Sequence, residues 1–364
     1  MNKPDTPLEH PLGPHLPAPG TATAVAPGVW WVRMGLPFAL DHINLWLLQD
    51  VHNGRPGWTV VDCGISDANT RHSWETLFAT ALGGLPVWRV VVTHMHPDHI
   101  GLAQWLCDRW STPEHTCQLW ISATDHHAAW MGSSSTTGFG GPEAARFFAS
   151  HGLQDPATVQ QIHDRAGYYS SLVPAVPRSF VRLMDGMDLR IGGDTWTCIA
   201  GYGHAPEHMA LSCPARGLLI SGDMVLPTIS TNVSVHEMEP EGNPLALFLA
   251  SLERYGTLAP DTVVLPSHGR PFQGLHTRLG QLRAHHAERL AEVLTACTAR
   301  PCHGVDLLPV MFKRPLDLHQ TTFALGEVVA HLHHLWFDGW LERSRGTDGV
   351  YRFTRAATAL SSTG

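Results

Sequence analysis

The segment His94-Met95-His96-Pro97-Asp98-His99 places three imidazoles and one carboxylate within six residues. It follows an apolar run over 88–94, which predicts a buried strand leading into a polar turn. His94 and His96 are separated by one residue, so at a strand end their side chains point to the same side. These nitrogen and oxygen donors are sufficient to begin two sites for borderline-soft metals. The segment therefore predicts metal-dependent chemistry.

Histidine is also abundant elsewhere, with 25 copies in 364 residues. The pairs His126/His127, His285/His286 and His333/His334 lie in segments with helical spacing. They lack the strand-end geometry of the first cluster. We therefore interpret these pairs as solvated or hydrogen-bonded helix residues, not as ligands.

The surrounding elements predict an α/β fold, because short apolar runs alternate with helical patterns. Helices are expected over 66–82 and 100–110. Strands are expected at 29–34, 43–49, 58–64, 88–94 and 118–123, and later in the runs FVRLM, TWTCIAG, ALSCP, GLLISGD and TVVLPSH. We expect the helices to lie outside the sheets.

The amino-acid composition divides the chain into three parts, the second of which contains an insertion. Residues 1–20 are rich in proline and predict a flexible arm, and 21–273 form the expected catalytic domain. Within it, 124–178 has no strand character and is expected to be a helical insertion, either a lid or a cover for a sheet face. Residues 274–364 have the pattern of helices followed by a hairpin around GTDG, which predicts a winged-helix-like tail.

Some side chains are candidates for lining a pocket. Asp41, His42 and Asn44 lie near a strand start, where an ordinary turn is the alternative interpretation. The insertion contributes apolar and aromatic side chains suited to an acyl or aromatic group, or else to a small helical core of their own: Trp130, Met131, Phe139, Phe147, Tyr168 and Tyr169.

From about 25 to 273 the sequence resembles the metallo-β-lactamase superfamily. The resemblance rests on five motifs in the family's order: VVDCG (60–64), HMHPDH (94–99), GYGHAPEH (201–208), LLISGD (218–223) and VLPSHG (264–269). It implies an αβ/βα sandwich with a site for two divalent metals, as in glyoxalase II-like and RNase Z-like members. We expect zinc, with iron and manganese as alternatives, since histidine and carboxylate ligands suit all three.

The resemblance also assigns roles to residues. It implies that His94, His96 and His204 hold the first metal, that Asp98, His99 and His268 hold the second, and that Asp223 bridges both. Asp62 would lie beside the metals without binding them. In the third motif Glu207 replaces the family's usual glycine, and it either orients a ligand or faces solvent. His208 is expected to pack or hydrogen-bond near the site.

These features favour hydrolysis by a metal-bridged hydroxide, with Asp98 as the catalytic residue that holds the water and helps to move its proton. The expected substrates are small esters, thioesters or lactones. The alternative is an endoribonuclease or phosphodiesterase whose tail binds nucleic acid. This alternative is the weaker one because the net charge is −8. The tail from 313 also carries six Lys and Arg against five Asp and Glu, so few of its cations are uncompensated.

The cysteines and the lengths of the apolar runs indicate the compartment and the partners of the protein. Seven cysteines without a CxxC pair favour free thiols in a reducing compartment, so we expect a cytoplasmic protein. Apolar runs are too short for a membrane helix, and the first twenty residues show no signal peptide. We expect a small-molecule substrate and no membrane partner. The tail is expected to close a pocket or to form a homodimer in preference to binding DNA.

Overall fold

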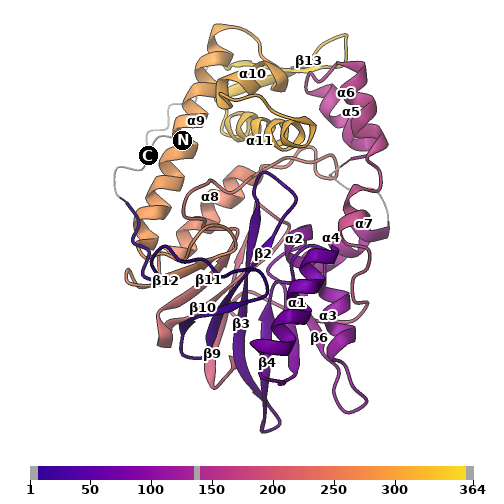
Figure 1. Ribbon diagram of the computed structural model, residues 1–364. Coiled ribbons are helices and arrows are strands. Elements are labelled where there is room, and N and C mark those ends of the chain that lie inside the picture. Colours follow the sequence, from indigo (N-terminus) through magenta and orange to yellow (C-terminus); the bar gives the residue numbers. More distant parts are fainter. Residues whose placement is uncertain (1–6, 135–139, 358–364) are drawn as a thin grey trace. The chain divides into compact units, whose positions relative to one another are not determined.

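The computed structural model of the chain describes residues 7–134 and 140–357 (Figure 1). Its described residues divide into two compact units that interleave along the sequence. Unit 1 comprises 7–134, 169–231 and 251–279, and unit 2 comprises 140–168, 232–250 and 280–357. The five sequence motifs all lie in unit 1.

Unit 1 contains two β-sheets. The first has seven strands in chain order: β1 (Ala22–Ala26), β2 (Val29–Gly35), β3 (His42–His52), β4 (Arg55–Val61), β5 (Val87–Val91), β6 (Gln118–Ser122) and β7 (Phe180–Leu183). The second has the order β12-β11-β10-β9-β8, with β8 (Asp188–Ile191), β9 (Asp194–Gly201), β10 (His208–Cys213), β11 (Leu218–Gly222) and β12 (Val263–Pro266). Strands β4 to β7 pair in parallel, as do β11 and β12.

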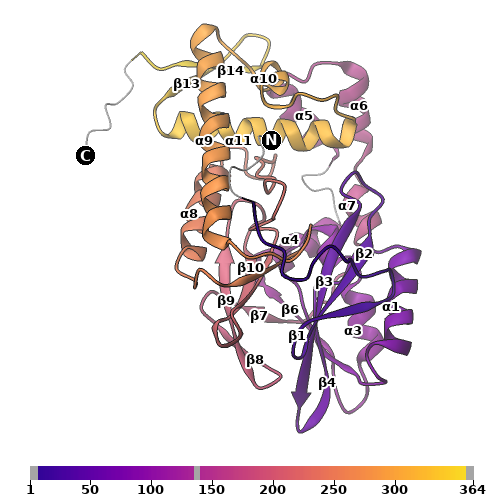
Figure 2. The ribbon, with the colours of Figure 1, turned by 60° about the vertical axis from the view of Figure 1, so that its left-hand side comes forward.

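The helices of unit 1 are α1 (Ala68–Thr80), α2 (Pro97–Ile100), α3 (Ala103–Trp110), α4 (Ala123–Ser134) and the short α7 (Tyr168–Leu172), whose last four residues belong to this unit. Helix α1 contacts β2, and α3 contacts β5 and β6 (Figure 2). Asp67 begins α1 by accepting a hydrogen bond from the Thr70 N–H. The predicted α/β fold with helices outside the sheets is confirmed.

The two sheets enclose an apolar core. Trp31 and Trp46 of the first sheet stack with ring centroids 6.3 Å apart, and Trp196, Met209 and Ile220 of the second sheet belong to the same buried cluster. Each such side chain contributes about 1.5–3 kcal/mol through burial. This core fixes the sheets against each other and thereby fixes the strand ends that carry the motifs.

Part of the N-terminal segment is held more firmly than the prediction of a flexible arm implies. Glu9 forms a β-bridge with Gln273, and the His10 Nδ1 lies 2.9 Å from the Pro271 carbonyl oxygen. Arg270 donates to the carbonyl of Gly13. These bonds anchor residues 9–13 because the segment runs beside the chain that follows β12.

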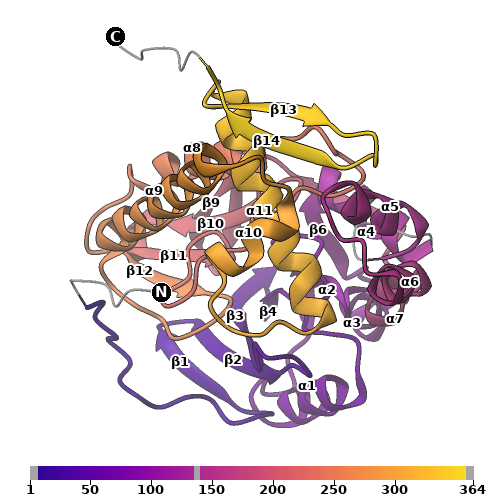
Figure 3. The same cartoon turned by 90° about the horizontal axis from the view of Figure 1, so that it is seen from above.

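Unit 2 contains α5 (Pro142–Ser150), α6 (Pro156–Asp164), α10 (Gly304–Met311), α11 (Leu318–Phe337) and the hairpin of β13 (Leu341–Arg345) and β14 (Tyr351–Arg355) (Figure 3). It also holds the first part of α8 (Pro244–Tyr255) and most of α9 (Leu275–Ala299). Its core includes Val293, Leu307, Val328, Leu332 and Phe353. The hairpin expected around GTDG is present.

The segment expected to be an insertion is shared between the two units. Its first part forms α4 in unit 1, whereas α5 and α6 pack with each other in unit 2. There the Val305 N–H donates to the His151 carbonyl, and Gly152, with φ +99°, lies so close to His303 that a Cβ would meet the ring at 2.3 Å. Residues 140–168 therefore pack against the C-terminal part of the chain.

Buried histidines in unit 2 predict acid sensitivity. Burial lowers the pKa of His286 to about 2 and that of His331 and His151 to about 4. When unfolded these groups bind protons below about pH 6.5, so their contribution is complete above that pH and is lost as the pH falls toward 4. Burial also raises the pKa of Glu327 to about 7 and raises the pKa of Glu237, which acts in the opposite direction but involves fewer groups than the histidines.

We therefore expect the free energy of unfolding of the metal-free chain to fall by at least about 1 kcal/mol between pH 7 and pH 5 in urea titrations. The variant His286→Gln should reduce this slope. His72→Gln, at an exposed position on α1, is the matched control and should leave it unchanged. An identical slope in His286→Gln and the wild type would contradict the assignment.

Candidate metal centre

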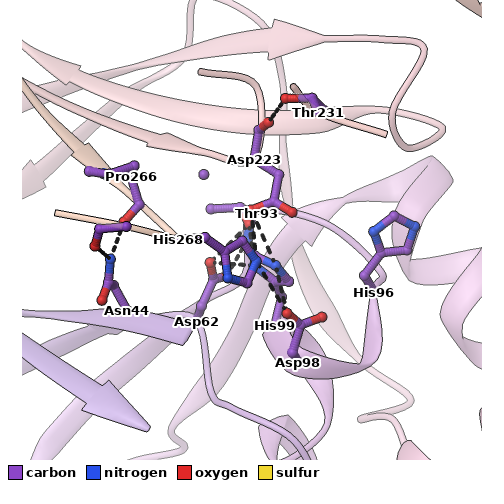
Figure 4. Close-up of polar contacts among 12 residues, drawn as sticks. Asn44, Asp62, Thr93, His96, Asp98, His99, Asp223, Thr231, Pro266 and His268 are labelled. Atoms are coloured by element: carbon purple, nitrogen blue, oxygen red, sulfur yellow. Dashed lines mark hydrogen bonds and ion pairs between the residues drawn. The ribbon is translucent and has the colours of Figure 1, made fainter. Parts of the chain in front are cut away.

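The predicted site residues meet at one end of unit 1, where the strands of both sheets terminate (Figure 4). Parallel strands bring their carboxyl ends to the same edge, and ligand sites form at such edges. Asp62 follows β4, the histidine cluster follows β5, His204 lies between β9 and β10, Asp223 follows β11, and His268 lies just beyond β12.

Three histidines converge at one point of this edge. The Nε2 of His94 lies 2.9 Å from the Nδ1 of His96 and 3.2 Å from the Nε2 of His204. One ligand atom from each of the three lies within 4.8 Å of the others. We call these residues the three-histidine group. Their spacing is compatible with one metal bound at about 2.0–2.1 Å from each nitrogen.

Asp98, His99 and His268 form a second convergent set, which we call the Asp98 group. The Nε2 of His268 lies 3.4 Å from the Asp98 Oδ2, and the His99 Nε2 lies 3.6 Å from the same oxygen. His99 and His268 are buried, while Asp98 is half-buried.

Asp223 lies between the two groups. Its Oδ2 is 3.4 Å from the His204 Nε2, whereas its Oδ1 is 3.4 Å from the His268 Nε2 and 3.6 Å from the His99 Nε2. One carboxylate thus presents one oxygen to each group, which is the geometry expected of a bridging ligand.

Burial and neighbouring charges shift the pKa values of His94 and His268 in opposite directions. Burial, reinforced by the neighbouring imidazoles of His99 and His96, holds the pKa of His94 well below its usual range, so this ring is neutral and able to bind a metal. Burial also disfavours the charged form of His268, but the carboxylates of Asp223 and Asp98 outweigh it and raise its pKa to about 10. A cation at this site would compete with that proton.

The residues fit divalent metal ions. The His99 Nε2 and the Asp223 Oδ1 are buried and have no hydrogen-bond partner among the described residues. Buried polar atoms are nearly always satisfied, so two such atoms facing each other indicate a missing partner. Imidazole nitrogens and carboxylate oxygens together are the donors that zinc, iron and manganese accept.

Asp62 orients the Asp98 group from behind. It accepts hydrogen bonds from the backbone N–H and hydroxyl of Thr93 at 2.8 and 2.9 Å, and its Oδ2 accepts from the His99 Nδ1 at 2.8 Å. Its φ of +63° is a strained conformation for a non-glycine residue, which these bonds stabilise. Because the His99 Nδ1 donates to Asp62, its Nε2 faces the site.

His208 and Glu207 lie outside the ligand set. The His208 Nε2 accepts from the Asp223 N–H at 3.1 Å, and a Cβ on Gly222 would meet that nitrogen at 2.1 Å, so glycine is required there. Glu207 is half-buried, and its carboxylate accepts a hydrogen bond from the Thr124 hydroxyl. Its N–H donates to Asp125, a residue that the sequence did not single out.

Asn44 holds the loop that carries His268. Its side-chain amide donates to the carbonyls of Pro266 and Gly269, both at 2.8 Å, while its Oδ1 accepts from the Trp31 indole (Figure 4). The His268 Nδ1 donates to the His42 carbonyl at 2.7 Å, leaving Nε2 for the site. Asn44 therefore supports the site from within the protein, and its burial excludes it from the surface of a pocket.

The aromatic residues of the insertion do not form one cluster in the described parts of the chain. Trp130 and Met131 on α4 are 45% and 44% exposed. Tyr169 is buried in unit 1, and its hydroxyl donates to the carbonyl of Met95. Phe147 and Tyr168 belong to unit 2, and Phe139 lies outside the described residues.

Two family models match this chain. The family model for the metallo-beta-lactamase superfamily matches residues 40–268, and the model for the metallo-beta-lactamase-like C-terminal domain matches 290–356. A probable metallo-hydrolase of Bacillus subtilis (strain 168), YqjP, is 24% identical over 315 residues, covering 83% of this chain and 90% of that protein.

Two crystal structures are similar over nearly the whole chain. A beta-lactamase domain protein from Burkholderia ambifaria is 53% identical with a TM-score of 0.90, covering 96% of this chain and 98% of that one. The metallo-beta-lactamase family protein TTHA1429 from Thermus thermophilus is 27% identical with a TM-score of 0.71, covering 91% and 100%. No described helix of our chain is both long and apolar enough to cross a bilayer.

The position of Asp62 generates a test. Asparagine also tolerates a positive φ, but in Asp62→Asn the His99 Nδ1–H loses its charged acceptor. We expect zinc affinity, measured by competition with a chromophoric chelator, to fall about 10–100-fold. Asp67→Asn is the matched control, because asparagine caps a helix as well as aspartate does. If Asp62→Asn binds zinc with wild-type affinity, the orienting role of Asp62 is wrong.

Proposed function

Because the chain belongs to the metallo-β-lactamase superfamily and is a metallo-hydrolase of that family, we propose that it is a dinuclear hydrolase. The observation that carries the proposal is the placement of Asp223, whose two carboxylate oxygens face different ligand groups. In this proposal His94, His96 and His204 hold one metal, Asp98, His99 and His268 hold the other, and Asp223 is shared. Zinc is the proposed metal, with iron and manganese as alternatives.

Divalent metals bound here would supply Lewis acidity and make hydroxide available near neutral pH. The protein's own contribution is orientation. Asp62 and the His42 carbonyl each fix one imidazole with its Nε2 toward the site. Asp98, with its Oδ2 facing His268, is positioned to orient an attacking water and to take its proton.

We propose small esters, thioesters or lactones as substrates, because a net charge of −8 does not favour polyanions. Two of the four arginines of the C-terminal hairpin are ion-paired within unit 2. Arg343 pairs with Glu241 and lies over the Trp336 ring, and Arg352 pairs with Asp348. Phosphate binding usually requires several uncompensated cations. Nucleic acid therefore remains the weaker alternative.

We also propose a cellular compartment for the enzyme and a role for its C-terminal part. All seven cysteines are buried and free, which supports a reducing, cytoplasmic compartment. Helices α9 to α11 followed by the β13–β14 hairpin have the order typical of a winged helix. We propose that this C-terminal part forms a homodimer contact.

A substrate panel tests the reaction class. Zinc-loaded protein should hydrolyse thioesters, aryl esters or lactones and leave phosphodiesters and short RNA intact, when product is measured at pH 7. Asp223→Ala should reduce turnover at least about 10³-fold, because both groups lose a ligand. Asp261→Ala, at an exposed site in unit 1, is the control for loss of a carboxylate.

Cleavage of RNA or phosphodiesters alone would replace the acyl-transfer proposal with a nuclease. Turnover in Asp223→Ala equal to that of the wild type would overturn the dinuclear mechanism itself.

A further inference from the structure

A buried carboxylate outside all five motifs connects the two chain segments that carry the three-histidine group. Asp125 lies in the first turn of α4 and is fully buried. Its Oδ1 accepts from the Met95 N–H at 2.8 Å, and its Oδ2 accepts from the Glu207 N–H at 2.6 Å. Met95 lies between His94 and His96, and Glu207 follows His204 by three residues.

The peptide groups around Met95 are held at a second point. The Tyr169 hydroxyl donates to the Met95 carbonyl at 2.5 Å, so the N–H and the carbonyl of this residue are both bound by side chains. Tyr169 approaches α4 closely, because a Cβ on Gly132 would meet its ring at 2.7 Å. Helix α4 thus supplies the carboxylate and also makes room for the tyrosine.

We infer that Asp125 is a positioning residue for the metal of the three-histidine group. By binding one N–H on each segment, its carboxylate fixes the separation of His94 and His96 from His204. The Asp98 group depends on other supports, namely Asp62 behind His99 and Asn44 under the His268 loop (Figure 4). Different side chains therefore support the three-histidine group and the Asp98 group.

This role predicts a selective defect. Asparagine has nearly the same shape as aspartate but only one acceptor oxygen, so in Asp125→Asn one of the two backbone N–H groups would face an NH₂ donor. The inference rests on the proposed ligand roles. It predicts that Asp125→Asn weakens one of two zinc sites about 10–100-fold and leaves the other within about threefold of the wild type.

The experiment is a zinc titration of the metal-free full-length chain against a chromophoric chelator, together with thermal unfolding of the metal-free protein. Asp50→Asn is the matched control. Asp50 is also buried and contacts neither ligand segment. Its Oδ1 accepts from the backbone N–H groups of Val51 and Gly192, and its Oδ2 pairs with Arg89. It should lower thermal stability and leave both zinc affinities unchanged.

A double-mutant cycle identifies the affected site. Adding Asp125→Asn to His204→Ala should cause little further loss of zinc affinity. Adding it to His268→Ala should lower zinc affinity by the same factor as Asp125→Asn does in the wild type. If Asp125→Asn does not fold, Tyr169→Phe removes the hydroxyl that donates to the Met95 carbonyl and should weaken the same site about two- to fivefold.

The results separate the possible failures. If the wild type binds no zinc, the proposed function fails. If it binds two zinc ions and Asp125→Asn binds both with wild-type affinity, the positioning role is wrong. Equal zinc loss in Asp50→Asn and Asp125→Asn would also overturn it, since any buried carboxylate would then have the same effect.

Discussion

The candidate site in unit 1 is subject to one electrostatic constraint, the crowding of basic nitrogens and carboxylates at the strand ends. The His94 Nε2 lies within 3.2 Å of nitrogens from two other histidines, and neither a proton nor a hydrogen bond can satisfy all three lone pairs at once. Such an arrangement in a buried place is stable only if something holds the rings together or a cation occupies the space between them.

The fold meets this constraint with backbone geometry and braces. Parallel strands deliver the motifs to a common edge, and the Met209 N–H donates to the Thr93 carbonyl, which joins the two sheets at that edge. Behind the ligands, Asp62, Asn44 and His208 each bind the backbone or a ring nitrogen of a ligand segment. Rigid supports of this kind preserve the ligand geometry before any metal binds.

The proposed ligands could be named from sequence because the five motifs are local. HMHPDH is contiguous and points to a metal by itself, whereas the other proposed ligands follow from the resemblance of their motifs to those of the superfamily. Asp125 and Tyr169 contact backbone atoms of Met95, which lies 30 and 74 residues away. A side chain that binds a distant backbone group leaves no pattern in the sequence, so no spacing rule could find it.

The secondary structure was also predictable only in part. The apolar strands were recognisable. The short edge strand β1 has no clear alternation of buried and exposed residues, and β8 alternates over only four residues. Helix α10 was not anticipated because it contains Pro309, and its capping box uses His303 where serine or threonine is usual. The division of residues 124–178 between two units depends on tertiary packing, for which the sequence carries no local signal.

The most direct test of the account is the zinc stoichiometry of the metal-free chain, measured by calorimetric titration at neutral pH. The shared position of Asp223 predicts two equivalents for the wild type and at most one tight equivalent for Asp223→Ala with unchanged secondary structure. A single equivalent in the wild type, or two equally tight equivalents without Asp223, would contradict a site built around one bridging carboxylate.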